Sequence, residues 1–199
     1  RLSSQYDKWR GHRIVLVDGT CLSMPNEPSL QSEFGVPNGY CGKGRNPIAK
    51  MVTLCLCNTM TVLAYKMGKY VSDENTLLYP LLKKLLKGDL LIADRHFAGA
   101  NLYCRYLSEG LEFLTRAHQK LKISRIKRLY SYSKNDFVGY LKIGENYRRK
   151  DPHLPAKIMV RFICATLPNR KKSSPIWFVT SLLDGDRYPA NEIVQQYAN

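Results

Sequence analysis

The stretch Ile14-Val15-Leu16-Val17-Asp18-Gly19 joins β-branched and aliphatic residues and ends abruptly at an acid and a glycine. A short apolar run that is bounded by such a turn signal is typical of a buried strand. The run therefore predicts a strand that ends at Asp18. A carboxylate in that place projects from a rigid element at the end of a sheet.

A second run of the same kind occurs later in the chain. Asp89-Leu90-Leu91-Ile92-Ala93 is short and apolar, and Asp94 follows it directly. It predicts another buried strand with an acid at its end. Asp18 and Asp94 are therefore the best-placed acids of the chain for chemistry.

The elements predicted around these two strands alternate between strand and helix. Three strands, a helix, a strand, a helix and a strand give an α/β layout, in which the two acid-terminated strands could lie side by side. In chain order they are a strand at 14–17, an irregular segment at 21–47, strands at 51–57 and 62–67 joined by a hairpin turn, a leucine-striped helix from its N-cap Ser72 to Gly88, a strand at 89–93, a helix at 98–109 and a strand at 111–115.

The character of the chain changes after this part. Residues 120–150 are strongly basic and contain only two acids, Asp136 and Glu145. Strand-like runs follow, and we interpret the whole as a β-rich insertion after the fifth strand, before a final helix begins. The predicted strands are 137–143, 157–166 and 176–182, and the predicted segments are a core at 1–116, an insertion at 117–186 and the start of a C-terminal helix at 187–199.

The formal net charge of the 199-residue chain is +15. A surface this basic suits a polyanion, and nucleic acid is the commonest one. A solubilising surface or a membrane-facing patch are the alternatives. No apolar run is long enough for a membrane helix. The six cysteines are scattered without a C-x-x-C pair, which favours reduced thiols in a cytosolic protein over a zinc site.

Two strand-end carboxylates can bind hard divalent cations through oxygen. This is the arrangement that metal-assisted phosphoryl transfer requires. The same pattern also occurs in ordinary aspartates that cap turns or helices. For Asp184-Gly185-Asp186 a turn is the preferred interpretation.

The sequence motifs around the two acids resemble those of a known family. Asp18 stands in V-L-V-D-G-T, and Asp94 stands in G-D-L-L-I-A-D-R-H-F. With the downstream S-S-P-I-W-F-V-T-S-L and the terminal N-E-I-V-Q-Q-Y, they resemble the DDE transposases of bacterial insertion sequences. More narrowly, the chain looks like the subgroup whose third acid lies in a helix of pattern Y-x-x-R-x-x-x-E-x-x-x-x-x-x-K. The resemblance spans nearly the whole chain.

The resemblance implies an RNase H-like mixed sheet in which Asp18 and Asp94 lie adjacent and share Mg²⁺ or Mn²⁺. Arg95 would contact a DNA phosphate or fix the neighbouring carboxylate, although a structural salt bridge is an equal alternative. His96 could assist proton transfer, but a structural role is preferred for it and for the other histidines.

The third acid is absent from these residues. Tyr197 fits the tyrosine that opens the terminal pattern, so the matching arginine and glutamate would fall beyond Asn199. Glu192 precedes the pattern and is not assigned a catalytic role. A fragment or a broken gene product would explain the absence. As given, we expect the chain to bind metal poorly and to turn over slowly or not at all.

DNA contact is predicted for the basic insertion and for a Gly-Lys-Gly-Arg loop. Their cations would neutralise phosphates without reading the base sequence, so binding would depend on salt. Trp177 matches a position where some hairpin-forming relatives carry a base-stacking tryptophan, although a buried structural tryptophan is the preferred alternative. The candidate DNA-binding residues are Arg95, Lys43, Arg45, Lys120, Lys122, Arg125, Lys127, Arg128 and Trp177.

The resulting hypothesis is a transposase that hydrolyses DNA at transposon ends and then joins the freed 3′-hydroxyl to target DNA. The resemblance implies DNA as the partner, a homodimer on paired ends, and a bacterial cytoplasmic protein that is associated with the nucleoid when bound. A metal-dependent nuclease of the same fold and a non-catalytic DNA-binding remnant are the alternatives.

Overall fold

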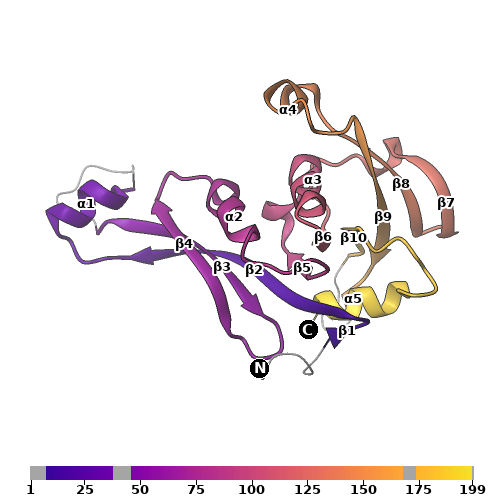
Figure 1. The fold of residues 1–199 in the computed structure, drawn as a ribbon, viewed down its shortest axis with the longest axis horizontal. Helices are drawn as coiled ribbons and strands as arrows, with labels where there is room; N and C mark the ends of the chain where they lie inside the picture. The colour runs from indigo at the N-terminus through magenta and orange to yellow at the C-terminus, as the bar shows by residue number, and fades with distance from the viewer. Residues whose placement is uncertain (1–7, 38–45, 168–173, 199) are drawn as a thin grey trace. The chain divides into compact units, whose positions relative to one another are not determined.

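We describe the chain from a computed structural model, which defines residues 8–37, 46–167 and 174–198 (Figure 1). It divides into two compact units. Unit 1 comprises residues 1–15 and 86–199, and unit 2 comprises residues 16–85. Within the described part of the chain, no helix is both long enough and apolar enough to span a membrane.

Unit 1 is built on a mixed sheet, which confirms the predicted α/β class. Its strands follow the order β2–β5–β6–β10–β9–β8–β7. The pair β5–β6 is parallel, and the pairs from β6 onward are antiparallel. The short strand β1 (Lys8–Trp9) pairs with the start of β2 (His12–Ser23). The other strands are β5 (Leu90–Ala93), β6 (Glu112–Arg116), β7 (Lys127–Ser133), β8 (Asp136–Lys142), β9 (Lys157–Ala165) and β10 (Ile176–Thr180).

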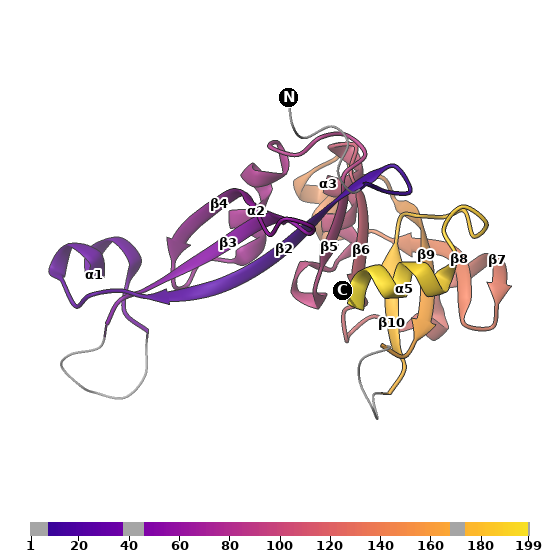
Figure 2. The same ribbon diagram turned by 90° about the horizontal axis from the view of Figure 1, so that it is seen from below.

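Two helices cover opposite faces of this sheet, α3 (Ala100–Ser108) and α5 (Ala190–Ala198) (Figures 1 and 2). The ring of Tyr103 on α3 stacks on Phe113 with centroids 4.2 Å apart. The ring of Tyr197 on α5 meets Phe178 at 5.0 Å. Because Phe178 lies opposite Arg116 and side chains alternate along a strand, Phe178 and Phe113 point to opposite faces.

Strands β7, β8 and β9 form the part of the sheet that the sequence predicts as an insertion. The 3₁₀ turn η2 (Ile123–Arg125) precedes β7, and the short helix α4 (Glu145–Lys150) connects β8 to β9. Strand β7 is exposed along its whole length. The division into a catalytic core and an insertion stays a prediction.

A buried arginine ties these strands to the segment that precedes α5. Arg161 on β9 is 1% exposed, and its Nε and Nη2 donate to the carboxylate of Asp136 at 2.7 and 2.5 Å. Its Nη1 donates to the carbonyl of Tyr188 at 2.7 Å. The guanidinium also lies 4.7 Å from the ring centre of Tyr132, whose hydroxyl donates to the Leu183 carbonyl. The start of α5 is thereby fixed against β8 and β9.

Unit 2 contains a three-stranded sheet of order β4–β3–β2 and one covering helix. The hairpin of β3 (Ile48–Leu56) and β4 (Val62–Lys69) matches the predicted pair. Helix α2 (Glu74–Leu82) buries four leucines against this sheet. The close packing explains Gly68, since a Cβ there would lie 2.8 Å from a methyl carbon of Leu77.

The structure corrects several predicted boundaries. Strand β2 continues to Ser23, so Asp18 lies inside the strand and not at its end. The segment predicted to be irregular contains the helix α1 (Pro28–Phe34). The N-cap of α2 is Asp73 and not Ser72, because the Asp73 carboxylate accepts from the backbone of Asn75.

Candidate functional site

Asp94 lies directly after the fully buried strand β5, as predicted. The last pair of the parallel register is Ala93 with Thr115, so Asp94 is level with Arg116. Since Arg116 shares a face with Phe178, the alternation of side chains places Asp94 on the sheet face that α5 covers. The Asp94 side chain is 47% exposed, so a buried strand presents its carboxylate to solvent.

A single 3₁₀ turn, η1 (Arg95–Phe97), fixes the Asp94 carboxylate. Asp94 is the N-cap of this turn, and its Oδ1 accepts from the backbone N–H of His96 at 2.8 Å. Its Oδ2 lies 2.9 Å from Nδ1 of the His96 ring. Phe97 anchors the turn, because it is 2% exposed and its carbonyl accepts from the buried Tyr106 hydroxyl.

Asp18 is exposed on β2 in unit 2. Its Oδ1 accepts from the N–H of Gly19 at 2.9 Å, and its carbonyl accepts from the Thr53 hydroxyl at 3.3 Å. A Cβ on Gly19 would lie 2.9 Å from the carboxyl carbon of Glu74. The glycine of the Asp-Gly-Thr motif therefore leaves room for Glu74, whose Oε1 lies 3.9 Å from Nζ of Lys50.

The two acids have the donor chemistry of a Mg²⁺ site. Both offer oxygen, and neither forms an ion pair with a lysine or arginine among the described residues. Within those same ranges no group of three or more His, Cys, Asp or Glu residues could hold a metal ion. Asp94 belongs to unit 1 and Asp18 to unit 2, and a metal shared between them stays a prediction.

A cationic pocket of about 210 Å³ lies beside Asp94 in unit 1. Arg95 enters it from η1, Arg116 and His118 from the end of β6, and Trp177 from the start of β10. None of the described residues that line it is acidic. The sequence singled out Arg95 and Trp177 but missed Arg116 as a site residue and rated His118 structural, because nothing in their spacing shows that three distant segments meet here.

Trp177 is half-buried, so it is neither a fully buried structural tryptophan nor a fully exposed surface for base stacking. Its ring packs edge-on against Phe137 with centroids 5.9 Å apart, while the side chain also lines the cationic pocket. Part of the indole therefore belongs to the packing of the sheet, and part can meet a ligand.

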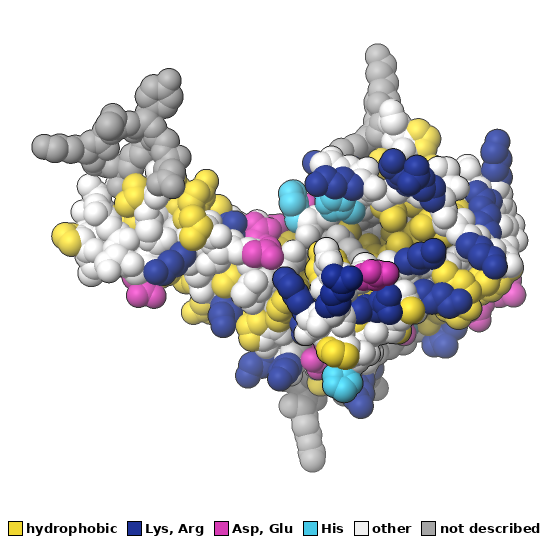
Figure 3. Space-filling view, turned by 90° about the horizontal axis from the view of Figure 1, so that it is seen from above, with side chains coloured by type: hydrophobic (Ala, Val, Ile, Leu, Met, Phe, Trp, Pro, Cys, Tyr) yellow, Lys and Arg dark blue, Asp and Glu magenta, His cyan; other side chains and the backbone are white. Residues whose placement is uncertain are grey.

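The basic residues predicted to contact DNA are largely exposed. Lys120, Lys122, Arg125, Lys127 and Arg128 all lie on the surface of unit 1, from the loop after β6 into β7. The Arg128 guanidinium lies 4.1 Å from the ring centre of Phe137, so packing already orients it. Figure 3 shows that Lys and Arg side chains are numerous on the face drawn there, mostly toward the right of the view. Lys43 and Arg45 lie outside the described residues.

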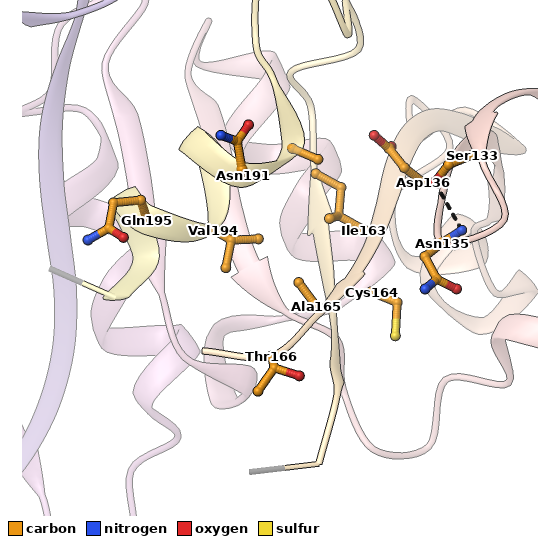
Figure 4. Close-up of a pocket in the computed structure, with 11 residues that line it drawn as sticks. Ser133, Asn135, Asp136, Ile163, Cys164, Ala165, Thr166, Asn191, Val194 and Gln195 are labelled. Carbon is orange, nitrogen blue, oxygen red and sulfur yellow. Dashed lines mark hydrogen bonds between the residues drawn. The ribbon is translucent and has the colours of Figure 1, made fainter. Parts of the chain in front are cut away.

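A larger pocket of about 400 Å³ lies between α5 and the ends of β8 and β9 (Figure 4). Asn191, Val194 and Gln195 of α5 face Ile163 and Ala165 of β9 across it. Its one charged lining residue among those described, Asp136, is bound to Arg161. The pocket offers amides and apolar side chains but no cation, so it does not suit a phosphate.

Helix α5 (Ala190–Ala198) lies within residues 187–199, where the sequence predicts the start of a C-terminal helix. Both carboxylate oxygens of Glu192 accept from the Arg10 guanidinium, at 2.8 and 2.6 Å. This hydrogen bonding lowers the pKa of Glu192 and keeps the carboxylate engaged. This engagement gives Glu192 a structural partner, and it is not assigned a catalytic role.

Other candidate groups have structural roles. Asp184 closes a turn, since its Oδ1 accepts from the backbones of Asp186 and Arg187. His12 bridges the Gly88 carbonyl and the Tyr188 hydroxyl, at 2.7 Å each. The described cysteines are free, and burial raises the pKa of the Cys104 and Cys164 thiols.

Comparison with solved structures gives distant likenesses. A piggyBac transposase in a synaptic complex with hairpin DNA is 10% identical, with a TM-score of 0.42 over 93% of this chain and 37% of that chain. Endonuclease V from Bacillus subtilis is 15% identical, with a TM-score of 0.39 over 94% of this chain and 70% of that chain. The present chain thus spans little more than a third of the piggyBac chain.

Comparison with family models gives a match over nearly the whole chain. No curated protein matches the chain. A family model described as the transposase DDE domain matches residues 9–198. Since that match covers nearly the whole sequence, from β1 to α5, the chain belongs to the transposase DDE domain family.

Proposed function

We propose that this chain is the catalytic core of a DNA transposase with an RNase H-like sheet. Asp18 and Asp94 would hold Mg²⁺ or Mn²⁺ through their carboxylate oxygens. The observation that carries the proposal is the placement of Asp94. Its exposed carboxylate stands on a rigid turn at the end of a buried strand, beside a cationic pocket and on the face that α5 covers.

The reaction would be an in-line displacement at phosphorus. Water attacks a phosphodiester at the transposon end, the P–O3′ bond breaks, and a 3′-hydroxyl is released. That hydroxyl then attacks a phosphodiester of target DNA and takes the place of its 3′ oxygen. Bound to the carboxylates, a divalent cation would lower the pKa of the attacking hydroxyl and stabilise charge on the leaving oxygen.

The residues of the cationic pocket would hold the DNA strand. Arg95 and Arg116 present guanidinium groups that match phosphate geometry, and the pocket exposes part of the Trp177 indole. An unpaired base can stack on an indole, and such stacking contributes about 1–3 kcal/mol per base. The exposed cations from Lys120 to Arg128 would bind neighbouring phosphates.

Removal of metal tests the catalytic part of the proposal. The protein is incubated with DNA from the flanks of its own gene, and cleavage and strand joining are followed on gels. With EDTA both products should fall to background, and Mg²⁺ or Mn²⁺ should restore them. Equal cleavage with and without EDTA contradicts the metal mechanism, and DNA binding without cleavage in Mg²⁺ favours a non-catalytic remnant.

Removal of charge from the pocket tests the DNA contact. Arg95→Ala and Arg116→Ala are each expected to weaken DNA binding about tenfold. Each lost phosphate contact should also lower the slope of log K against log salt by about 0.9. Both are measured by fluorescence anisotropy over a range of salt concentrations.

The matched control for that experiment is the double substitution of Lys83 and Lys84 by alanine, which removes two exposed charges from unit 2. It should change affinity far less than the double substitution of Arg95 and Arg116. If the two double variants have the same affinity and salt slope, the pocket is not a DNA site.

A further inference from the structure

His96 carries a side chain whose only described contact is with the candidate metal ligand Asp94. The ring nitrogen Nδ1 lies 2.9 Å from Oδ2 of Asp94, and the His96 side chain is otherwise 69% exposed. We infer that His96 is a positioning residue, which holds the Asp94 carboxylate in the orientation that binds the divalent cation. The inference rests on the proposed function, because it requires that Asp94 binds the metal.

The contact defines which nitrogen of the ring carries the proton. An ionised carboxylate can only accept hydrogen bonds, so Nδ1 must donate to Oδ2. The neutral ring is therefore the Nδ1–H tautomer, and Nε2 carries no proton. This tautomer can be measured without any metal.

Two donors of one residue fix both oxygens of Asp94. The His96 backbone N–H donates to Oδ1 at 2.8 Å, and the His96 ring donates to Oδ2 at 2.9 Å. Because each oxygen has further lone pairs, both can still bind a cation. The carboxylate plane is thus set before the cation binds.

The turn itself is rigid enough for this role. Ala93 precedes its N-cap and is 4% exposed, and Phe97 is its last residue and is 2% exposed. The Tyr106 hydroxyl donates to the Phe97 carbonyl at 3.0 Å. His96 is therefore held between two buried residues, and its ring can reach Asp94 without a change in the backbone.

The size of the change in metal affinity on loss of the His96 side chain distinguishes a positioning residue from an ordinary surface contact. An exposed charged pair contributes little to stability. By contrast, loss of a group that orients a metal ligand typically weakens metal binding by about 10–100-fold. A purely structural His96 would leave metal affinity unchanged, whereas a positioning His96 would change it.

The test is an NMR titration of ¹⁵N-labelled chain with Mn²⁺, which broadens the amide signals of nearby residues. The amides of residues 94–97 are expected to broaden in the wild type. His96→Ala should raise the Mn²⁺ concentration for half-broadening about tenfold. His96→Asn keeps an N–H donor that is bonded to Cγ, as Nδ1 of histidine is. Its Mn²⁺ concentration for half-broadening should therefore stay within about threefold of the wild-type value. His153→Ala, which replaces an exposed histidine far along the chain, is the matched control and should have no effect.

Each outcome has a defined meaning. If Asp94→Ala leaves the broadening unchanged, or the wild type shows none, the proposed metal site fails, and the role of His96 fails with it. If Asp94→Ala abolishes the broadening but His96→Ala matches the wild type, only the role of His96 is overturned. Independently of metal, ¹⁵N spectra of the neutral His96 ring should show the Nδ1–H tautomer, and the Nε2–H tautomer in the wild type would overturn the inference.

Discussion

Asp94→Asn is expected to lower Mg²⁺-dependent DNA cleavage by at least about 1,000-fold. Asparagine keeps the size of the side chain and one oxygen but removes the negative charge that binds the cation. It can still cap η1, since its carbonyl oxygen can accept from the His96 backbone. The fold and DNA binding should therefore stay nearly intact while cleavage is lost.

Asp18→Asn is expected to have an effect of the same size, because the proposed metal uses both carboxylates. Cleavage is measured under single-turnover conditions, and DNA binding is measured separately by anisotropy. The matched control is Asp186→Asn, an exposed aspartate whose backbone N–H, rather than its side chain, makes the described turn contact. Undiminished cleavage in both Asp18→Asn and Asp94→Asn would show that the acids are not catalytic.

Arg161→Ala is expected to lower the free energy of unfolding by about 3–5 kcal/mol, because it leaves a buried carboxylate without its partner. Asp136 is 6% exposed and receives two hydrogen bonds from Arg161. The Tyr188 carbonyl loses its 2.7 Å donor as well, so the segment before α5 loses its link to β9. Urea unfolding followed by circular dichroism measures the change.

A double variant separates the loss of the ion pair from the loss of packing. Replacing Arg161 with Met and Asp136 with Leu removes both charges and fills the space with apolar side chains, so it should recover much of the stability. Glu145→Ala removes the exposed pair of Glu145 with Arg149, whose side chains are 73% and 77% exposed, and should change stability by less than about 1 kcal/mol. Equal destabilisation by Glu145→Ala and Arg161→Ala would refute the claim that burial makes the loss of an ion-pair partner more costly.

Much of the core could be predicted from the sequence because its elements have strong local signals. The run before Asp94 is apolar at every position, and the structure has β5 there. The hairpin of β3 and β4 and the helix α3 were predicted for the same reason. Strand β7 escaped prediction, because all seven of its residues are exposed and it stands in a basic segment without an aliphatic run.

The length of β2 could not be read from its own residues. Residues 18–23 are mostly exposed and follow an Asp-Gly pair that locally favours a turn. They are extended because β2 continues as the neighbour of β3, with Thr53 bound to the Asp18 carbonyl. Pairing with a distant strand outweighed the local preference.

The candidate site was predictable where its residues adjoin a strand in sequence, and not where the fold brings segments together. Asp94 and Arg95 follow β5 directly. Arg116 and His118 come to the same pocket from the end of β6, next to Trp177 on β10. The contact of His96 with Asp94 depends on the geometry of a 3₁₀ turn, which a sequence pattern does not specify.

The pairing of Arg10 with Glu192 joins residues 182 positions apart in the chain. Unit 1 takes β1 and the start of β2 from residues 1–15 and everything else from residue 86 onward. During synthesis the whole of unit 2 must emerge before β5 exists for β2 to pair with, and α5 must emerge before Arg10 finds its carboxylate. Contacts between such distant residues form late and slow folding. Unit 1 is therefore completed only after residue 192 has emerged from the ribosome, long after its N-terminal strands have been made.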